Sequence, residues 1–201
     1  MRNLLTSMEE YATEFSVPIV RPQTRQLLLE TLAKEKPSEV LEIGTAIGYS
    51  TLLMLTSSDC RVTSIEKDCD MYQIACNNVA GATKIDSSIS NRCNLILGDA
   101  KDVMDNFIYN RKKFDFIFLD GPKGQYVKYL PVLIQLLNVN GVIFADDVYY
   151  HGLVKQQGEV DKKQRTIVRN LRQYLEDVNA DNLQSQVYDI EDGVAITRKL
   201  K

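Results

Sequence analysis

Short apolar runs alternate with segments of helical spacing along most of this 201-residue chain. The runs typical of buried strands lie at residues 39–43, 61–66, 94–97, 114–120 and 141–147. Helical segments follow them at residues 51–55, 70–82, 100–107, 126–137 and 166–178. Strands joined through helices indicate a mostly parallel sheet with helices on both faces.

The last part of the chain breaks this alternation. Two short strands are predicted at residues 186–190 and 194–198, on either side of Glu191-Asp192-Gly193. An Asp-Gly turn between short strands favours an antiparallel β-hairpin. The predicted fold class is therefore α/β, with a seven-stranded, mostly parallel sheet that ends in a C-terminal antiparallel hairpin.

Length and composition predict one soluble globular domain over residues 1–201. Two predicted helices, at residues 4–15 and 23–34, make up an N-terminal part (1–35) ahead of the sheet-forming core (36–201). The net charge of −3 gives no global signal for nucleic acid. The first 15 residues are too acidic for a signal peptide, and no apolar run is long enough to cross a membrane. We expect a cytoplasmic protein with no membrane partner.

The cysteines and the single histidine limit the metal chemistry. No two of the four cysteines form a Cys-x-x-Cys pair, which indicates reduced structural thiols. His151 is the only histidine, so we do not expect a histidine-based zinc site.

Residues 39–51 read EVLEIGTAIGYST, which predicts a strand, a tight turn and a helix. Gly44 and Gly48 allow a sharp turn or the close approach of a ligand. The Gly-x-x-x-Gly spacing does not match the Gly-x-Gly-x-x-Gly of pyrophosphate loops. Glu42 lies inside the apolar strand and needs a partner there, which favours a cationic or hydroxyl-rich nucleoside ligand. The alternative is a glycine-rich turn that binds nothing.

Every predicted strand of the alternating part has an acidic residue at its end or within two residues of it. Because ligands of such sheets bind beyond the carboxyl ends of the strands, these side chains should face one crevice. Glu66 follows Gly44 by 22 residues, a spacing at which a carboxylate accepts hydrogen bonds from ribose hydroxyls; otherwise it is a solvated charge. The full set is Glu42, Glu66, Asp99, Asp120, Asp146 and Asp147.

Asp120, Asp146 and Asp147 are carboxylates with apolar neighbours at adjacent strand ends. Like charges this close raise one another's pKa, and a hard cation such as Mg²⁺ relieves the repulsion. Some of them could instead cap helices. Lys123 follows Asp120 by three residues. A cation nearby would lower the pKa of Lys123 and suit it to act as a general base; alternatively it is a surface lysine paired with an aspartate.

The segments LEIGTAIGYS, IE, GDA, LDGPKGQY, FADDV and EDGVAI occur in this order between residues 17 and 198. Together they resemble the divalent-metal-dependent O-methyltransferases of the catechol and caffeoyl-CoA type. The resemblance implies a Rossmann-like class I methyltransferase fold, S-adenosylmethionine (SAM) as cofactor, Mg²⁺ or Mn²⁺, and a homodimer. It also implies the site residues: Val20, Glu42, Gly44 and Ser50 at the methionine end, Glu66 at the ribose, Asp99 and Ala100 at the adenine, Asp120 at cofactor and metal, Asp146 and Asp147 at the metal, and Lys123 as the base.

One position departs from the family pattern. Asp-Asn is usual where this chain has Asp146-Asp147. The extra charge should tighten metal binding and reduce Lewis acidity, which leaves the preferred metal open.

Within the family, GTAIGYS, KGQY and GLV resemble a bacterial branch that methylates 5-hydroxyuridine in tRNA. A basic segment follows, with six cations against two carboxylates between residues 151 and 175, a local charge of +4. Such a patch suits phosphate binding, although a solvated helix face has the same composition. The cations are Lys155, Lys162, Lys163, Arg165, Arg169 and Arg172.

The sequence thus predicts a metal-dependent SAM O-methyltransferase that converts wobble 5-hydroxyuridine to 5-methoxyuridine and binds the tRNA anticodon region. One alternative is methylation of a small catechol-like phenol. Another is a SAM-binding RNA module without catalysis, against which the intact acidic residues and Lys123 argue. Tyr149, Tyr150 and His151 either wall a substrate pocket or are ordinary loop residues.

Overall fold

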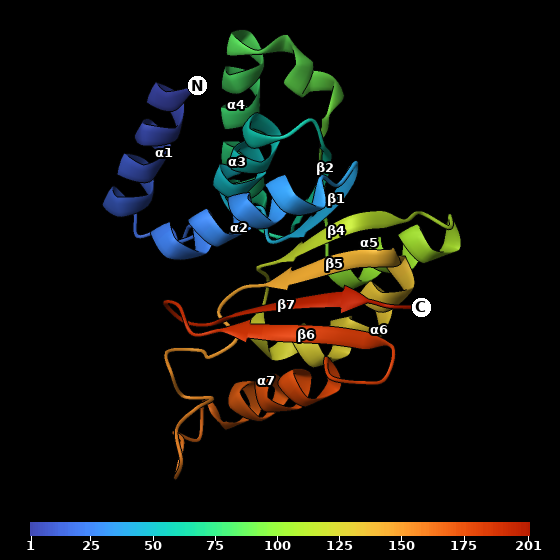
Figure 1. Ribbon diagram of the computed structural model, residues 1–201. Helices are drawn as coiled ribbons and strands as arrows, with labels where there is room; N and C mark the ends of the chain where they lie inside the picture. Colours follow the sequence, from blue (N-terminus) through green and yellow to red (C-terminus); the bar gives the residue numbers. More distant parts are fainter. The chain divides into compact units, whose positions relative to one another are not determined.

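The computed structural model describes residues 1–201, which form two compact units (Figure 1). The first unit is Met1–Val103 and the second is Met104–Lys201. Helix α5 (Ala100–Tyr109) begins in the first unit and ends in the second. None of the helices is both long enough and apolar enough to cross a bilayer.

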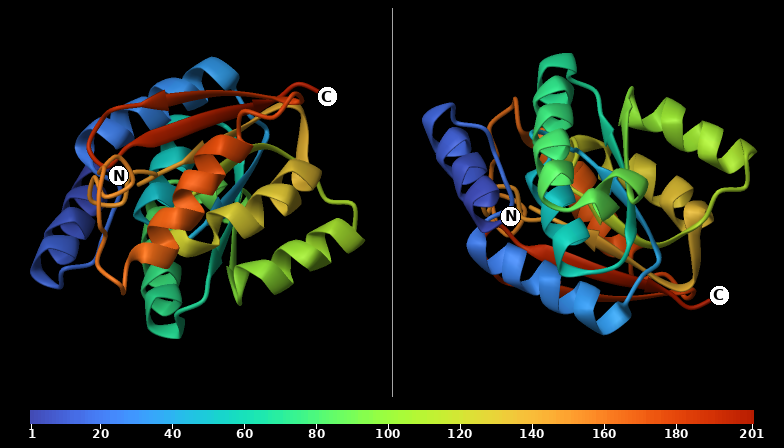
Figure 2. Two further views of the ribbon diagram at one scale, coloured as in Figure 1. Left: turned by 90° about the horizontal axis from the view of Figure 1, so that it is seen from below. Right: turned by 90° about the horizontal axis from the view of Figure 1, so that it is seen from above.

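The first unit holds three parallel strands in the order β3-β2-β1. Helices α1, α3 and α4 contact one another, and α2 contacts α3 (Figure 2). The strands are β1 (Glu39–Ile43), β2 (Arg61–Glu66) and β3 (Cys93–Leu97). The helices are α1 (Arg2–Glu14), α2 (Pro22–Glu35), α3 (Tyr49–Ser57), α4 (Cys69–Ile85) and the short η1 (Ser87–Asn91).

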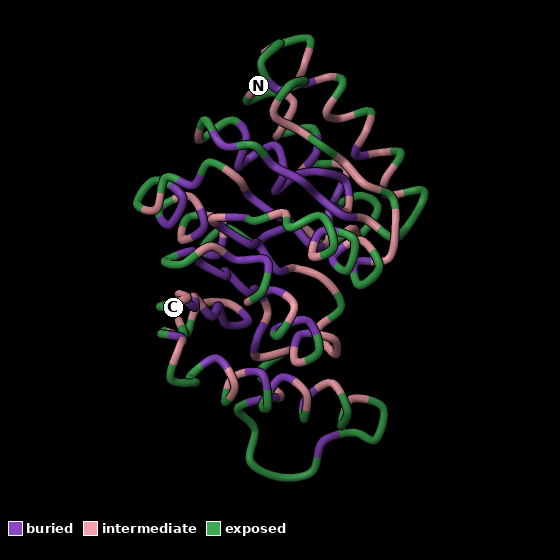
Figure 3. Tube along the Cα trace, turned by 90° about the vertical axis from the view of Figure 1, so that its right-hand side faces the viewer, coloured by how far each residue is buried: buried purple, intermediate pink, exposed green.

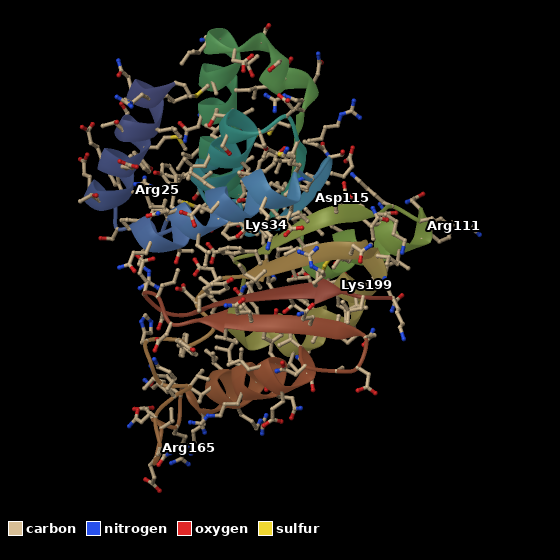
Figure 4. All side chains as sticks on the ribbon, viewed as in Figure 1. Arg25, Lys34, Arg111, Asp115, Arg165 and Lys199 are labelled. Atoms are coloured by element: carbon tan, nitrogen blue, oxygen red, sulfur yellow. The ribbon has the colours of Figure 1, made fainter.

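Continuous runs of buried residues form the core of this unit. Four of the five residues of β1 are buried, and α3 is buried from Tyr49 to Leu55. Strands covered on both faces read as unbroken apolar runs, so the pattern of β1 is typical of a parallel sheet. Figure 3 shows that buried positions gather along the strands. An ion pair joins the two N-terminal helices: Arg25 on α2 lies 2.6 Å from the Glu9 carboxylate on α1 (Figure 4).

The second unit holds four strands in the order β4-β5-β7-β6. β4 and β5 are parallel, and β7 is antiparallel to both β5 and β6. Helices α6 and α7 pack against each other on one face of these strands (Figure 2). The strands are β4 (Phe114–Leu119), β5 (Leu137–Ala145), β6 (Leu183–Tyr188) and β7 (Val194–Lys199). The helices are η2 (Lys123–Gln125), α6 (Tyr126–Leu136) and α7 (Arg165–Asp177).

The predicted strands and the predicted hairpin are present, in the order β3-β2-β1 within the first unit and β4-β5-β7-β6 within the second. The boundary of β5 was wrong: the strand ends at Ala145, whereas the sequence predicts that it includes Asp146 and Asp147. Asp147 has a φ of 56°, which no extended strand accommodates. The short helices η1 and η2 were not predicted. The single-domain boundary stays a prediction.

Candidate active site

Two glycines shape the loop between β1 and α3. Gly44 and Gly48 have φ angles of 98° and 81°, in the left-handed region that favours glycine. A Cβ on Gly48 would also lie 3.3 Å from the Cβ of Ala75 on α4, so the loop and α4 would have to separate. The loop therefore needs both glycines for its path, as the sequence predicts.

Glu42 is completely buried beneath this loop. Its carboxylate accepts hydrogen bonds from the hydroxyls of Ser50 (2.5 Å), Thr51 and Ser64 (2.6 Å). These donors offset the cost of burying the charge. They also join β1 to the first turn of α3 and to β2. The partner that the sequence requires for Glu42 is thus supplied by the protein's own hydroxyls, and contact between Glu42 and a methionine moiety stays a prediction.

Glu66 lies at the end of β2, against the same loop. One carboxylate oxygen accepts the backbone N–H of Ala46 at 2.8 Å. The other accepts the N–H groups of Lys67 and Asp68, both at 2.8 Å. Backbone donors therefore fix the orientation of the carboxylate beside the loop.

Asp99 lies at the end of β3, the neighbouring strand. It accepts hydrogen bonds from the Lys67 ammonium at 2.9 Å and the Lys101 N–H at 3.0 Å. The Lys67 bond, followed by the Lys101 bond, lowers the pKa of Asp99. Ala100 begins α5 and is 9% exposed. The first unit also holds Val20 and Ser50, which are both buried.

Asp120, Asp146 and Asp147 come together in the second unit, as the sequence predicts. Their carboxylates each offer an oxygen, and these atoms lie within 4.8 Å of one another. Leu119 on β4 is paired with Ala145 on β5, so the residues that follow leave the two strands at the same level. Burial, then the charges of Asp120 and Asp147, raises the pKa of Asp146 to about 8.

Lys123 lies beside these carboxylates. Its ammonium is 2.6 Å from Asp120 and 3.5 Å from Asp147, and 15% of its side chain is exposed. Burial lowers the pKa of Lys123, but Asp120, Tyr126, Asp147 and Asp146 outweigh this and raise it well above its usual value. The protein's own charges therefore act against the lowered pKa that the sequence predicts, whereas a cation held by the carboxylates would act in the predicted direction.

Tyr126 is a site residue to which the sequence assigned no role. Its buried hydroxyl accepts a hydrogen bond from Lys123 at 3.0 Å. Its single O–H hydrogen is within donating distance of two carbonyl oxygens, those of Leu119 (2.9 Å) and Asp146 (3.0 Å), and is shared between them. The hydroxyl thus links the ends of β4 and β5 beneath the carboxylates. The signal in the sequence that could have identified Tyr126 is its position three residues after Lys123, within an apolar segment.

Replacing Tyr126 with Phe is expected to lower the free energy of unfolding by about 1–3 kcal/mol, because the Asp146 carbonyl and the Lys123 ammonium lose a buried partner. Urea denaturation measures this change. Tyr174 is the matched control, since it is equally buried, its ring lies 5.5 Å from that of Tyr126, and its hydroxyl has no hydrogen-bond partner. Tyr174→Phe should leave stability unchanged or raise it. Equal losses in the two variants would contradict the role given to Tyr126.

The cations of the basic segment, residues 151–175, have different surroundings in the structure. Lys155 pairs with Asp189 at 2.7 Å and lies 4.4 Å above the Tyr149 ring. Lys162, Lys163 and Arg169 are exposed. The cations of this segment therefore do not form one uniform phosphate-binding surface.

Two arginines of this segment hold the loop that precedes α7. Arg165, where this loop meets the helix, donates to the Val160 carbonyl at 2.9 Å (Figure 4). Arg172 donates to the carbonyls of Val154 (3.0 Å) and Gln156 (2.7 Å). An open groove of about 400 Å³ lies here, between the loop and α7.

Comparisons with known proteins agree with this arrangement. The profile of the O-methyltransferase family matches residues 3–200. A caffeoyl-CoA O-methyltransferase of Populus kitakamiensis is 27% identical over 209 residues, covering 100% of this chain and 85% of the relative. A crystal structure from Staphylococcus aureus, provisionally named a caffeoyl-CoA O-methyltransferase, superimposes with a TM-score of 0.86 at 32% identity, covering 97% of this chain and 91% of that one.

Another solved structure, an O-methyltransferase of Bacillus cereus in complex with SAH, has a TM-score of 0.83 at 22% identity and covers 98% of this chain and 90% of that one. The fold is that of a class I methyltransferase, as the sequence predicts. The chain belongs to the O-methyltransferase family. Within it, this protein is a SAM-dependent O-methyltransferase of the caffeoyl-CoA O-methyltransferase type.

Proposed function

We propose that this enzyme transfers the SAM methyl group to one of two vicinal hydroxyl oxygens on a small phenolic molecule of the catechol type. The observation that carries the proposal is the cluster of Asp120, Asp146 and Asp147 beside Lys123 at the ends of two parallel strands. The relatives support the small-molecule class, because their names include caffeoyl-CoA and flavonoid methyltransferases of plants.

The acidic cluster fits a divalent cation. Carboxylate oxygens are the hard ligands that Mg²⁺ and Mn²⁺ prefer. Burial, and then the negative charges of Asp120 and Asp147, raise the pKa of Asp146, and a cation would offset the repulsion among these carboxylates. A cation held by these three residues supplies Lewis acidity, which lowers the pKa of a bound hydroxyl.

Lys123 is the residue placed to take the hydroxyl proton. Its side-chain nitrogen lies 2.6 Å from Asp120 and 3.0 Å from the Tyr126 hydroxyl. Lys123 accepts the proton in its neutral amine form; the substrate oxygen then forms its bond to the methyl carbon while the carbon–sulfur bond breaks and its electron pair stays on sulfur. Positioning by the surrounding residues lowers the barrier, since the reacting groups are held rather than meeting by diffusion.

Glu66 is proposed to accept hydrogen bonds from the ribose hydroxyls of SAM. Glu66→Ala should weaken SAM binding by about 1–3 kcal/mol, the usual effect of losing a charged acceptor. Titration calorimetry measures this, with Asp70→Ala as the control because Asp70 is an exposed carboxylate in the first turn of α4. Unchanged affinity in Glu66→Ala would exclude the ribose assignment.

Methylation of 5-hydroxyuridine in tRNA is the second candidate. The base presents vicinal O4 and O5 atoms, and the segment 151–175 carries a local charge of +4. This candidate is weaker because Lys155 is paired with a carboxylate, while Arg165 and Arg172 hold the loop before α7.

The deciding experiment offers purified enzyme, radiolabelled SAM and Mg²⁺ to a panel of catechols and, separately, to bacterial tRNA that contains 5-hydroxyuridine. We expect label in the catechol products. Label in tRNA together with inert catechols would overturn the small-molecule assignment in favour of RNA. Lack of transfer to any compound with vicinal oxygens would overturn both.

A further inference from the structure

The segment that follows Asp147 has a strained backbone. Asp147, Tyr150 and His151 have φ angles of 56°, 47° and 56°, although none of them is glycine. Left-handed conformations are unfavourable for such residues and persist only where the surroundings enforce them. The direction of the Asp147 side chain therefore depends on whatever holds residues 147–152 in place.

The turn of the β6–β7 hairpin constrains this segment through backbone hydrogen bonds. Val148 N–H donates to the Gly193 carbonyl at 3.0 Å, and Tyr149 N–H donates to the Asp192 carbonyl at 2.8 Å. β7, which starts at Val194, is paired with β5, whose last residue precedes Asp146. The turn is thus anchored to the strand from which the acidic cluster emerges.

The Asp192 side chain makes two further hydrogen bonds to the segment. One carboxylate oxygen accepts the N–H of His151 and the other accepts the N–H of Gly152 at 3.0 Å. Asp192 is only 6% exposed, so its carboxylate is largely shielded from water, although the two donor residues lie at the surface. The first of these N–H groups belongs to His151, a residue other than glycine with positive φ, which is where the segment most needs support. The imidazole of His151 lies 3.8 Å from the same carboxylate.

We propose that Asp192 is a positioning residue for the metal ligands. Its carboxylate fixes the left-handed segment and thereby directs the Asp147 carboxylate toward Asp120 and Asp146. This inference rests on the proposed function, since it assigns Asp192 to the support of the cation-binding residues. Asp192 itself is not among the clustered carboxylates.

Binding of Mn²⁺, followed by electron paramagnetic resonance in the absence of substrate, tests the proposal. The Asp192→Asn side chain retains its size, but its amide nitrogen cannot accept the second N–H. We expect a loss of Mn²⁺ affinity of about 10–100-fold, the usual effect of removing a group that orients a metal ligand. Should this variant not fold, Asp192→Ser, whose hydroxyl can accept one N–H, replaces it with the same expected direction.

Asp189→Asn is the matched control. Asp189 belongs to the same hairpin connection and carries the same charge, but its exposed carboxylate pairs with Lys155. Its loss should change Mn²⁺ affinity by no more than about threefold, as for a typical surface ion pair.

A second-site change separates support of the backbone from a simple effect of charge. Glycine adopts positive φ readily, so adding His151→Gly to Asp192→Asn should restore most of the lost affinity. The His151 side chain is 76% exposed, so little packing is lost. Unchanged Mn²⁺ binding in Asp192→Asn, or no recovery in the double variant, would overturn the role of Asp192 and leave the metal-dependent function standing. Wild-type enzyme that binds no Mn²⁺ would overturn the metal-dependent function and the role of Asp192 together.

Discussion

Treatment with EDTA is expected to abolish methyl transfer, and added Mg²⁺ or Mn²⁺ should restore it. The reason lies in the three clustered carboxylates, which repel one another and offer oxygen ligands to a cation. Initial rates with labelled SAM, before and after metal is returned to stripped enzyme, measure the effect. Full activity in excess EDTA would contradict the proposed mechanism.

Single substitutions refine this result. Asp120→Ala should reduce the rate at least about 100-fold, the upper range for loss of groups that merely orient a ligand. Asp147→Asn should remain active, because its amide oxygen still offers a ligand atom. Asp181→Ala is the control, since Asp181 is an exposed aspartate of the same unit that is absent from the cluster. Equal losses in Asp120→Ala and Asp181→Ala would remove the support for a metal at these residues.

Lys123→Ala is expected to lower kcat by about 10²–10⁴-fold, the usual contribution of a general base. Lys123→Arg should be nearly as inactive. Arginine keeps the positive charge next to Asp120 but stays protonated at any working pH. Measurement of kcat at saturating SAM, with SAM affinity determined separately by calorimetry, gives the comparison.

The pair of variants distinguishes two roles of Lys123. A lysine that serves only as a counter-ion to the carboxylates would be replaced well by arginine. High activity in Lys123→Arg would therefore disprove the base assignment. Weakened SAM binding in both variants would instead indicate damage to the cofactor site.

The convergence of the acidic side chains was predictable from sequence because the carboxyl ends of parallel strands share one edge of a sheet. To predict that Asp120, Asp146 and Asp147 cluster, it was enough to place the two strands correctly in the sequence. The error of two residues at the end of β5 did not change this prediction. The need of Glu42 for a partner was predictable from burial alone. Its partners, the hydroxyls of Ser50, Thr51 and Ser64, depend on how β1, α3 and β2 pack.

Other parts of the site depend on contacts between distant positions. The Tyr126 hydroxyl joins two strands whose register the sequence does not specify. Asp192 reaches back about 40 residues to His151 and Gly152, although sequence alone indicates only a turn there. Composition likewise cannot separate Arg172, which holds backbone carbonyls, from a solvated arginine. The single domain, the homodimer and the cytoplasmic location remain predictions.

The loop between β5 and α7 is held by hydrogen bonds from residues that lie outside it. Asp192 holds its start at His151 and Gly152, while Arg172 and Arg165 on α7 hold its later part. The stretch from 157 to 164 is mostly exposed apart from the buried Val160, whose carbonyl accepts the Arg165 hydrogen bond. We expect that insertions or exchanges there change the groove without moving the clustered carboxylates. Under the proposed function, this loop is the part of the enzyme in which sequence changes would alter the choice of acceptor molecule while the proposed catalytic residues stay in place.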